Sequence, residues 1–277
     1  MFPIASLLPQ LPRAKIIDVG AAEGPEGPVY TKLMGALPCE VVGFEPDVAE
    51  CEKLNRQAGS THLYLPHAIG DGSRRTFYEC TSPYCSSLFE PNIALADKFQ
   101  NLGDLLRVVG TRPIETRRLD DLSETANADF LKVDVQGGEL LVLQGAIERL
   151  RSILAVHIEV EFLPLYKDQP LFADIDSFLR AQGFAFHTLV PSGRTFKPVL
   201  VNNDPSGWVR QIVWADAVYV RDFMTFAELA PDSLLKLAAI LHEIYESVDV
   251  TALALVAYDK QIGSQLQAKY LTRLAGR

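Results

Sequence analysis

The feature that most constrains the fold is the segment at residues 15–24, Lys-Ile-Ile-Asp-Val-Gly-Ala-Ala-Glu-Gly. Its apolar start predicts a buried strand over Lys15–Val19. Gly20 and Gly24 then predict a turn into a helix over Glu26–Leu37, whose first turn tolerates the prolines found there. A strand–glycine turn–helix unit places backbone N–H groups at the carboxyl edge of a parallel sheet. A nucleotide-like ligand can bind at that edge.

The acid in this segment indicates which ligand the sheet edge binds. A dinucleotide fold would show Gly-x-Gly-x-x-Gly, spaced for a pyrophosphate, whereas this chain has Asp-x-Gly-x-x-x-Gly. Asp18 and Glu23 would repel a phosphate and attract a cation. S-adenosylmethionine (SAM) carries an ammonium and a sulfonium and no phosphate, so the pattern favours SAM over NAD. The alternative is an ordinary strand–helix turn with a capping acid.

A second acid follows the next predicted strand. That strand covers Glu40–Glu45, and Pro46 separates it from a helix that Asp47 can cap. In nucleotide-binding α/β folds, an acid at this place accepts hydrogen bonds from the ribose hydroxyls. Glu45 therefore predicts a ribose contact, which SAM and NAD share. A solvated acid at a strand end is the alternative.

A third predicted strand, Thr61–Ile69, ends beside candidate contacts for an adenine ring. Ala68 offers a backbone contact and Ile69 an apolar wall. His67 either faces the reaction centre or has a structural role.

A second strand–glycine turn–helix unit begins at Phe130. Phe130–Val135 predicts an apolar strand with Asp134 near its end, and a Gln-Gly-Gly-Glu turn leads to a helix over residues 139–150. A buried acid at the end of a central strand is costly unless it has a partner. A cationic cofactor or a substrate hydroxyl would supply that partner. Because parallel strands share one carboxyl edge, we expect Asp134 next to Asp18.

Three polar residues alternate along the next predicted strand, Ile153–Val160. His157, Glu159 and Glu161 are two residues apart and therefore share one face. They predict a general base with its orienting partner, and our candidate bases are Asp134, Glu159 and then His157. We expect no metal; a divalent cation on Asp134, Glu159 and Glu161 is the alternative. In the simplest alternative, some of these side chains point to solvent.

The remaining elements predict an α/β fold with a mixed sheet. Residues 72–119 depart from the strand–helix pattern and predict an insertion that forms a lid or an acceptor-binding wall. Two late strands, Phe184–Leu189 and Gln211–Val220, have no clear helix between them. They predict an antiparallel edge on an otherwise parallel sheet.

The domain organisation follows from these boundaries. We expect an N-terminal arm at 1–14, a SAM-binding domain at 15–222 and a C-terminal helical extension at 223–277. Two helices, Pro231–Tyr245 and Ala252–Leu274, are predicted in the extension. Their apolar residues pack on the core or on a second subunit, so a homodimer through them is a prediction.

Charge and cysteine usage exclude several classes of partner. The net charge of −9 and the absence of a basic stripe argue against a nucleic-acid partner and against anionic lipid. No apolar run reaches the roughly 20 residues that span a bilayer, so we expect no membrane insertion. The four cysteines show no Cys-x-x-Cys spacing and fit reduced, cytoplasmic thiols.

The motifs together resemble the FkbM family of class I SAM-dependent methyltransferases. The resemblance covers residues 15–190 and rests on four blocks in the family's order. These are Ile-Ile-Asp-Val-Gly-Ala at 16–21 with Gly24, Gly-Phe-Glu-Pro at 43–46, Phe-Leu-Lys-Val-Asp-Val-Gln-Gly-Gly-Glu at 130–139, and Ile-Glu-Val-Glu-Phe-Leu-Pro-Leu-Tyr at 158–166.

The resemblance implies a Rossmann-like fold: a seven-stranded, mostly parallel sheet with one antiparallel strand, helices on both faces, and here the added C-terminal helices. It also implies SAM as cofactor and O-methylation of a sugar or natural-product hydroxyl. Asp18, Gly20 and Gly24 would hold the methionine end, Glu45 the ribose, and Asp134 would lie by the sulfonium. The complete expected cofactor set is Asp18, Gly20, Ala21, Ala22, Gly24, Glu45, Pro46, Ala68, Ile69, Asp134 and Val135.

Two other functions remain open on the sequence. One is an NAD-linked oxidoreductase on a similar sheet. The other is a non-catalytic module that keeps the fold to bind a glycan or a partner protein. The acids at all three ligand-facing strand ends argue against the non-catalytic module. The identity of the small-molecule or glycan acceptor is not encoded in any motif.

Overall fold

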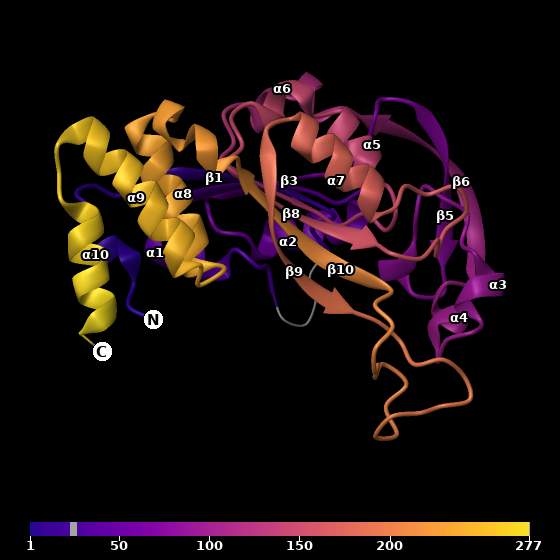
Figure 1. Cartoon of the computed structure of the whole chain (residues 1–277). Coiled ribbons are helices and arrows are strands. Elements are labelled where there is room, and N and C mark those ends of the chain that lie inside the picture. Colours follow the sequence, from indigo (N-terminus) through magenta and orange to yellow (C-terminus); the bar gives the residue numbers. More distant parts are fainter. Residues whose placement is uncertain (23–26, 277) are drawn as a thin grey trace.

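The computed structural model describes residues 1–22 and 27–276, which fold around a seven-stranded sheet (Figure 1). Its strands are β1 (Ala14–Val19), β2 (Cys39–Phe44), β3 (His62–Leu65), β7 (Phe130–Val133), β8 (Ala155–Glu161), β9 (Phe184–Ser192) and β10 (Trp214–Arg221). They lie in the order β3-β2-β1-β7-β8-β10-β9. β10 is antiparallel to both neighbours, and the other pairs are parallel. The predicted fold class is confirmed.

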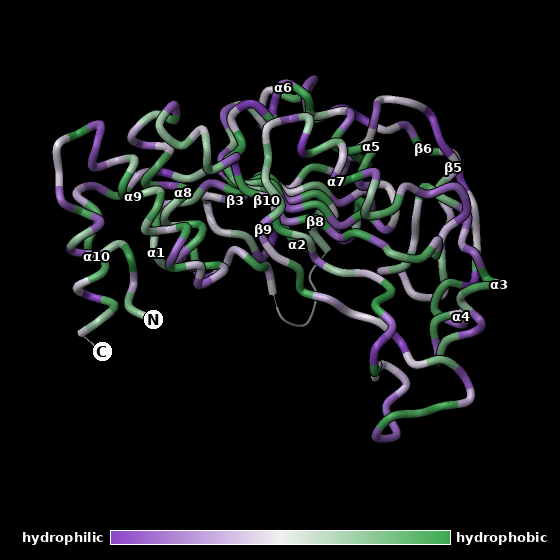
Figure 2. The backbone as a smooth tube through the Cα atoms, in the orientation of Figure 1, coloured by the Kyte–Doolittle hydropathy of each residue, from purple (hydrophilic) through white to green (hydrophobic). Residues whose placement is uncertain are grey.

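The two faces of the sheet carry separate hydrophobic cores, because successive side chains of a strand point to opposite faces. Ile16 packs in the core under α1 (Thr31–Ala36), α8 (Pro231–Glu243) and α9 (Val248–Ile262). Ile17 packs in the core under α5 (Glu139–Gln144), α6 (Ile147–Leu150) and α7 (Phe172–Ala181). Figure 2 shows the hydrophobic stretches concentrated in the central strands. The sheet is therefore covered on both sides.

The predicted strand Thr61–Ile69 is wrong as a single element. Pro66 follows β3 and has no N–H for the ladder, so pairing in the large sheet ends at Leu65. The chain then turns away, and β4 (Ala68–Ile69) pairs in parallel with β6 (Val108–Arg117). The small sheet has the order β4-β6-β5.

The predicted insertion is a hairpin with two short helices. β5 (Arg74–Cys80) runs antiparallel to β6, and α3 (Ile93–Ala96) and α4 (Leu102–Leu105) lie between them in the chain. In Figure 1 these elements stand at the end of the molecule opposite α8 and α9. The insertion thus extends beyond the edge of the large sheet, next to the loops that follow β7 and β8.

Three predicted helices differ from the observed ones. The first begins at Thr31, and part of its predicted range lies outside the described residues. The helix predicted over 139–150 breaks at Gly145, where a Cβ would meet the carbonyl oxygen of Gly70 at 2.1 Å. The helix predicted over Ala252–Leu274 is divided into two helices, α9 and α10 (Leu266–Ala275). The division occurs because Gly263 ends α9 in the left-handed conformation. α2 (Val48–Gln57) begins as predicted, with the Asp47 side chain accepting from the Glu50 N–H.

The N-terminal arm packs against the C-terminal helices. The Ile4 N–H donates to Glu243 Oε1 at 2.7 Å, and His242 Nε2 lies 2.8 Å from the Phe2 carbonyl oxygen. Short 3₁₀ helices cover Ile4–Ser6, Pro83–Cys85, Leu119–Asp121, Ser123–Thr125 and Phe223–Glu228. Among the helices of the described chain, none has the length and apolarity to cross a membrane. The division at residues 14 and 222 stays a prediction.

Candidate active site

A cavity of about 690 Å³ opens at the carboxyl ends of β1, β2 and β7. Its volume falls in the range of about 300–1,000 Å³ that is typical of small-molecule sites. Eight of the residues expected to bind a cofactor line it: Gly20, Ala22, Glu45, Pro46, Ala68, Ile69, Asp134 and Val135. The structure thus brings together loops that are up to 115 positions apart in the sequence, from 20 to 135.

The other predicted residues lie elsewhere. Asp18 and Ala21 are buried beside the cavity and do not line it. Glu159 lines a second, smaller cavity, which shares Gln136 with the first. Gly24 lies outside the described residues.

The glycine turn after β1 approaches the loop after β7 closely. Gly20 has a φ of +78°, and a Cβ at this position would lie 1.9 Å from the Asp134 carbonyl oxygen. The N–H groups of Gly20 and Ala21 both donate to the Phe44 carbonyl oxygen at 3.1 Å. These two N–H groups are therefore not free for a ligand, contrary to expectation. The glycine is required by the contact between two loops.

The carboxylate of Asp18 contacts Tyr30 and Lys132 on the face of the sheet that α1 and α8 cover. It is 4% exposed, and the Tyr30 hydroxyl donates to Oδ2 at 2.8 Å. Lys132 Nζ lies 3.2 Å from Oδ1, across the pair of strands β1 and β7. The carboxylate expected to meet a cationic cofactor is thus paired with a lysine. The cause is the register, which places Asp18 directly opposite Lys132.

Lys132 is a site residue that the sequence reasoning missed. Its Nζ also donates to the Gly20 carbonyl oxygen at 2.6 Å and lies 3.9 Å from Asp134 Oδ2. Burial opposes the charge of this lysine, but Asp18 and Asp134 outweigh burial and raise its pKa. The signal was present in the sequence, since a lysine interrupts an apolar strand.

Glu45 stands at the carboxyl end of β2 with its carboxylate at the cavity wall. The Asp47 N–H donates to Glu45 Oε1 at 2.8 Å. Burial raises the pKa of Glu45, and this N–H partly offsets the shift. The side chain is therefore fixed at the cavity wall, and the ribose contact expected of it stays a prediction.

Asp134 and Glu159, the first two candidate bases, are joined by an amide. Gln136 Nε2 donates to Asp134 Oδ1 at 3.0 Å and to Glu159 Oε2 at 2.6 Å. The Tyr166 hydroxyl lies 3.1 Å from Gln136 Oε1. The prediction did not include Gln136, which adopts the left-handed backbone conformation with a φ of 59°.

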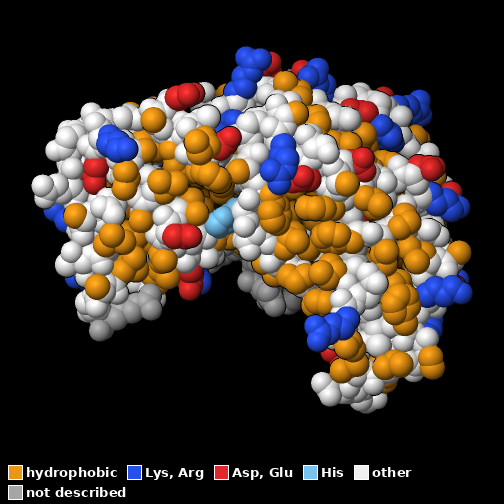
Figure 3. All heavy atoms as spheres, viewed as in Figure 1, with side chains coloured by type: hydrophobic (Ala, Val, Ile, Leu, Met, Phe, Trp, Pro, Cys, Tyr) orange, Lys and Arg blue, Asp and Glu red, His pale blue; other side chains and the backbone are white. Residues whose placement is uncertain are grey.

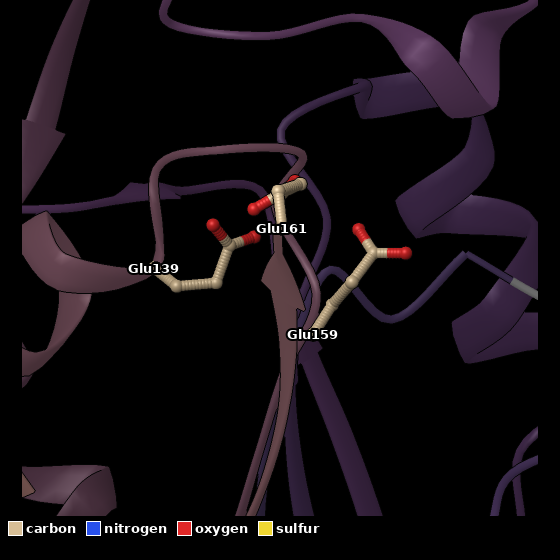
Figure 4. Close-up of side chains that lie close together, drawn as sticks. All are labelled: Glu139, Glu159 and Glu161. Carbon is tan, nitrogen blue, oxygen red and sulfur yellow. The ribbon is translucent and has the colours of Figure 1, made fainter. Parts of the chain in front are cut away.

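Glu139, Glu159 and Glu161 form a carboxyl cluster, with one oxygen of each within 4.8 Å of the others (Figure 4). Burial raises the pKa of all three, to about 7 for Glu139, and the neighbouring acids add to the shifts of Glu159 and Glu161. The metal alternative named Asp134 in place of Glu139. In the described chain it is Glu139, from the start of α5, that joins the two glutamates.

His157 is separated from the other candidate bases. It precedes Glu159 by two residues, which places it roughly 7 Å deeper along the strand. Its Nδ1 lies 3.3 Å from the Tyr245 hydroxyl, and its Nε2 lies 3.7 Å from Asp216 Oδ2. His157 lines neither cavity, and its contacts are with the segment after α8 and with β10.

The insertion forms one wall of the larger, cofactor-sized cavity of about 690 Å³. Phe77, Tyr84, Ser86 and Arg112 line it, with the Arg112 guanidinium 4.9 Å from the Phe77 ring centre. Ser87 does not line it, and its hydroxyl donates to the Gln136 carbonyl oxygen at 2.6 Å. The insertion is therefore tied directly to the loop after β7.

The strand order, the antiparallel β10 and the cleft at the carboxyl ends of β1 and β2 define a class I methyltransferase fold. The sequence profile of the FkbM methyltransferase domain matches residues 18–186. The chain therefore belongs to the FkbM methyltransferase family, whose cofactor is SAM.

Solved structures with a similar fold include an FkbM methyltransferase from Methylobacillus flagellatus KT, at 16% identity and a TM-score of 0.41. The alignment covers 79% of this chain and 48% of that one, so this chain spans about half its length. The SAM-bound magnesium protoporphyrin IX methyltransferase from Synechocystis PCC 6803 is 11% identical, with a TM-score of 0.36 and coverage of 79% and 76%. A precorrin-6y C5,15-methyltransferase from Geobacter metallireducens GS-15 is 11% identical, with a TM-score of 0.35 and coverage of 78% and 84%. Among curated protein sequences, none matches this chain significantly.

Proposed function

We propose that this protein transfers a methyl group from SAM to a hydroxyl oxygen of a sugar or natural-product acceptor. The observation that supports the proposal is the Asp134–Gln136–Glu159 cluster. In this cluster Asp134 lines the cofactor-sized cavity, Glu159 lines the smaller cavity, and Gln136, which lines both, joins the two carboxyl groups. A hydroxyl that reaches this cluster has a proton acceptor within hydrogen-bond distance.

The residues of the large cavity fit SAM part by part. Glu45 offers a carboxylate to the ribose, while Ala68 and Ile69 offer backbone and an apolar wall to the adenine. The absence of a side chain at Gly20 leaves the space that lets its loop close on Asp134. We assign Gly20, Ala22, Asp134 and Val135 to the methionine end.

Bound SAM supplies a methyl group that is already activated by the positive sulfur. The chain then has to orient the hydroxyl in line with that methyl and to accept its proton. Asp134 is our first choice for the base, with Glu159 second. The oxygen–methyl bond forms as the sulfur–methyl bond breaks, the proton moves to the carboxylate, and a neutral thioether remains. We propose that no metal takes part.

Two alternatives make different binding predictions. An NAD-linked oxidoreductase would bind NAD and not SAM, which titration calorimetry with both ligands separates. A non-catalytic glycan or partner-binding module would bind SAM or a glycan without producing a methylated compound. The acid Glu45 does not distinguish the two nucleotides, so the calorimetric comparison is required.

The test is incubation with isotope-labelled SAM and a panel of hydroxylated acceptors, followed by mass spectrometry. We expect a labelled methyl ether from at least one acceptor. Asp134→Asn should lower kcat at least 100-fold, while Asp168→Asn, an exposed aspartate in a left-handed turn, should not change it. Normal turnover by Asp134→Asn would exclude Asp134 as the base, and a labelled product on nitrogen or carbon would exclude the O-methylation proposal.

Three further assignments belong with this proposal. We propose that residues 1–14, 15–222 and 223–277 act as arm, SAM-binding domain and helical extension. We propose a homodimer through the C-terminal helices, where Leu253, Ile262 and Leu271 are exposed, and light scattering tests it. We also propose that the protein acts in the cytoplasm, since all four cysteines are free. We propose a small molecule or glycan as its partner and not nucleic acid, because the net charge is −9.

A further inference from the structure

The Tyr166 hydroxyl lies 3.1 Å from Gln136 Oε1 and 3.0 Å from the Cys85 carbonyl oxygen. We propose that Tyr166 is a positioning residue for methyl transfer, which acts on Asp134 by fixing the side-chain amide of Gln136. The inference rests on the proposed function, in which Asp134 accepts the proton of the acceptor hydroxyl. Tyr166 does not line the cofactor-sized cavity, so its route to Asp134 is through Gln136.

The position of the Asp134 carboxylate depends on Gln136. The Asp134 side chain is 40% exposed, and Gln136 Nε2 donates to its Oδ1 at 3.0 Å. Lys132 Nζ lies 3.9 Å from Oδ2, which is beyond hydrogen-bond distance. A base has to lie within hydrogen-bond reach of the proton that it accepts, and a displacement of about 1 Å can lower the rate about 100-fold. The orientation of the Gln136 amide therefore bears on the rate.

Both polar atoms of the Gln136 side chain have partners. Nε2 donates to Asp134 Oδ1 and, at 2.6 Å, to Glu159 Oε2, while the Tyr166 hydroxyl donates to Oε1. A carboxyl group accepts a hydrogen bond whether or not it is protonated, so Nε2 keeps both acceptors in either form of Glu159. If the amide turned over, its oxygen would face the Asp134 carboxylate. A hydroxyl that donates to Oε1 favours the observed orientation.

The segment that carries Tyr166 is paired with the insertion. The Asn92 N–H donates to the Leu165 carbonyl oxygen at 2.7 Å, and the Lys167 N–H donates to the Glu90 carbonyl oxygen at 2.7 Å. These two hydrogen bonds flank Tyr166 on both sides in the chain. The backbone of Tyr166 is therefore fixed by contacts that do not involve its hydroxyl.

The Tyr166 side chain is buried and keeps its hydrogen. It is 1% exposed, and its N–H donates to Gln169 Oε1 at 2.6 Å. Burial raises the pKa of Tyr166 well above its usual value, so the hydroxyl stays protonated. Its one hydrogen is shared between Gln136 Oε1 and the Cys85 carbonyl oxygen. Tyr166 thus supplies a donor at a fixed place beside the Gln136 amide.

The insertion has a second anchor, which does not involve Tyr166. Figure 3 shows hydrophobic side chains gathered over β9 and the segment that follows it. Phe196 of this segment stacks on Phe99 of the insertion, with ring centres 4.3 Å apart. Phe99 and the ring of Tyr166 belong to one hydrophobic core. Tyr166→Phe keeps that ring, so the variant removes the hydroxyl without releasing the insertion.

Steady-state kinetics of the full-length protein test the proposal, with the acceptor that the labelled-SAM panel identifies. Tyr166→Phe should lower kcat about tenfold, as expected for the loss of one hydrogen bond, and leave both KM values within twofold. Tyr219→Phe is the matched control and should keep kcat within twofold. The Tyr219 ring is also fully buried and lines neither cavity, and its hydroxyl donates to Asp176 Oδ1 at 3.2 Å. An unchanged kcat in Tyr166→Phe would overturn the proposal.

A double-mutant cycle tests the route through Gln136. Gln136→Leu removes the amide on which Tyr166 acts, so Tyr166→Phe should change kcat less than twofold in that background. A tenfold loss in both backgrounds would show that Tyr166 acts by another route, and the proposal would be wrong. A purely structural role of the hydroxyl predicts this second result.

Hydrogen exchange gives a readout that does not depend on catalysis. In protein labelled with 15N-glutamine, the side-chain signal of Gln136 is identified by its absence in Gln136→Leu. Its hydrogens should exchange at least tenfold faster in Tyr166→Phe and at the wild-type rate in Tyr219→Phe. Unchanged exchange in Tyr166→Phe would overturn the inference. If the wild type methylated no acceptor, the proposed function would fail, while faster exchange in Tyr166→Phe would still show that Tyr166 fixes Gln136.

Discussion

Lys132 Nζ lies 3.2 Å from Asp18 Oδ1, across the two strands at the centre of the sheet. The same ammonium donates to the Gly20 carbonyl oxygen at 2.6 Å, at the turn that borders the cofactor-sized cavity. The pair therefore joins the interior of β7 to the loop that shapes the cavity. The charged side chain of Lys132 thus holds this loop from within the sheet.

Removing this ammonium should destabilise the fold. In Lys132→Met, Asp18 keeps a buried charge without its cation, and breaking a buried pair in this way costs roughly 3–5 kcal/mol. The double variant Asp18→Asn with Lys132→Met should lose less than Lys132→Met alone, because neither charge remains. Urea unfolding measures both, with the exposed Lys269→Met as control. An equal loss in the single and double variants would contradict the pairing.

A methyl group at Gly20 should disrupt the cavity. Gly20→Ala would place a Cβ 1.9 Å from the Asp134 carbonyl oxygen at a φ of +78°, so we expect loss of SAM binding by calorimetry and a lower unfolding temperature. Gly35→Ala is the matched control, since apart from its chain neighbours and its own helix backbone no described atom lies within 4 Å of its added Cβ, and a helix favours alanine over glycine by about 0.5–1 kcal/mol. SAM affinity unchanged by Gly20→Ala would show that the two loops can separate without consequence.

The free energy of unfolding should fall as the pH rises from about 4.5 to 7. Burial raises the pKa of Glu139 from 4.5 to about 7 in the folded state. Glu139 therefore loses its proton at a lower pH in the unfolded state than in the folded state, so a rise in pH favours the unfolded state. The loss is on the order of 3 kcal/mol from Glu139 alone. Glu139→Gln keeps an oxygen for the Val135 N–H and should reduce the slope, whereas the exposed Glu115→Gln should not. Urea titrations at pH 5, 6, 7 and 8 measure it, and identical slopes in the wild type and Glu139→Gln would contradict the raised pKa.

Chelation should not change methyl transfer. The carboxyl cluster of Glu139, Glu159 and Glu161 could attract a divalent ion, but raised pKa values favour protons on these groups near neutral pH. We expect activity within twofold after exhaustive treatment with EDTA, followed by gel filtration. Loss of activity that magnesium or manganese restores would establish a metal-dependent mechanism.

Much of the site could be located from sequence because it depends on strand ends. A parallel strand that ends in Asp-x-Gly, Glu-Pro or Asp-Val has its last side chains at one edge whatever covers its faces. This local rule placed Gly20, Glu45 and Asp134 at the cavity, and all three line it. The same reasoning does not reveal which groups pair with each acid.

Pairing depends on register, which a single strand does not specify. Asp18 has the position of a cofactor-binding acid, yet its place opposite Lys132 on the neighbouring strand makes it one half of a buried ion pair. Likewise His157 shares a face with Glu159 but lies too deep along β8 to reach the cavity.

The sequence by itself determined the mixed α/β sheet, the family and the strand ends that carry the acids, since hydrophobic periodicity and glycine turns are local properties of the chain. The tertiary structure alone decided that Gln136 joins Asp134 to Glu159 and that Arg194 lines the same small cavity as Glu159 and Glu161, because these arrangements bring together loops from distant segments. The distances between these residues depend on how β7, β8 and the loop after β9 pack together. The sequence of any one of these segments does not specify that packing.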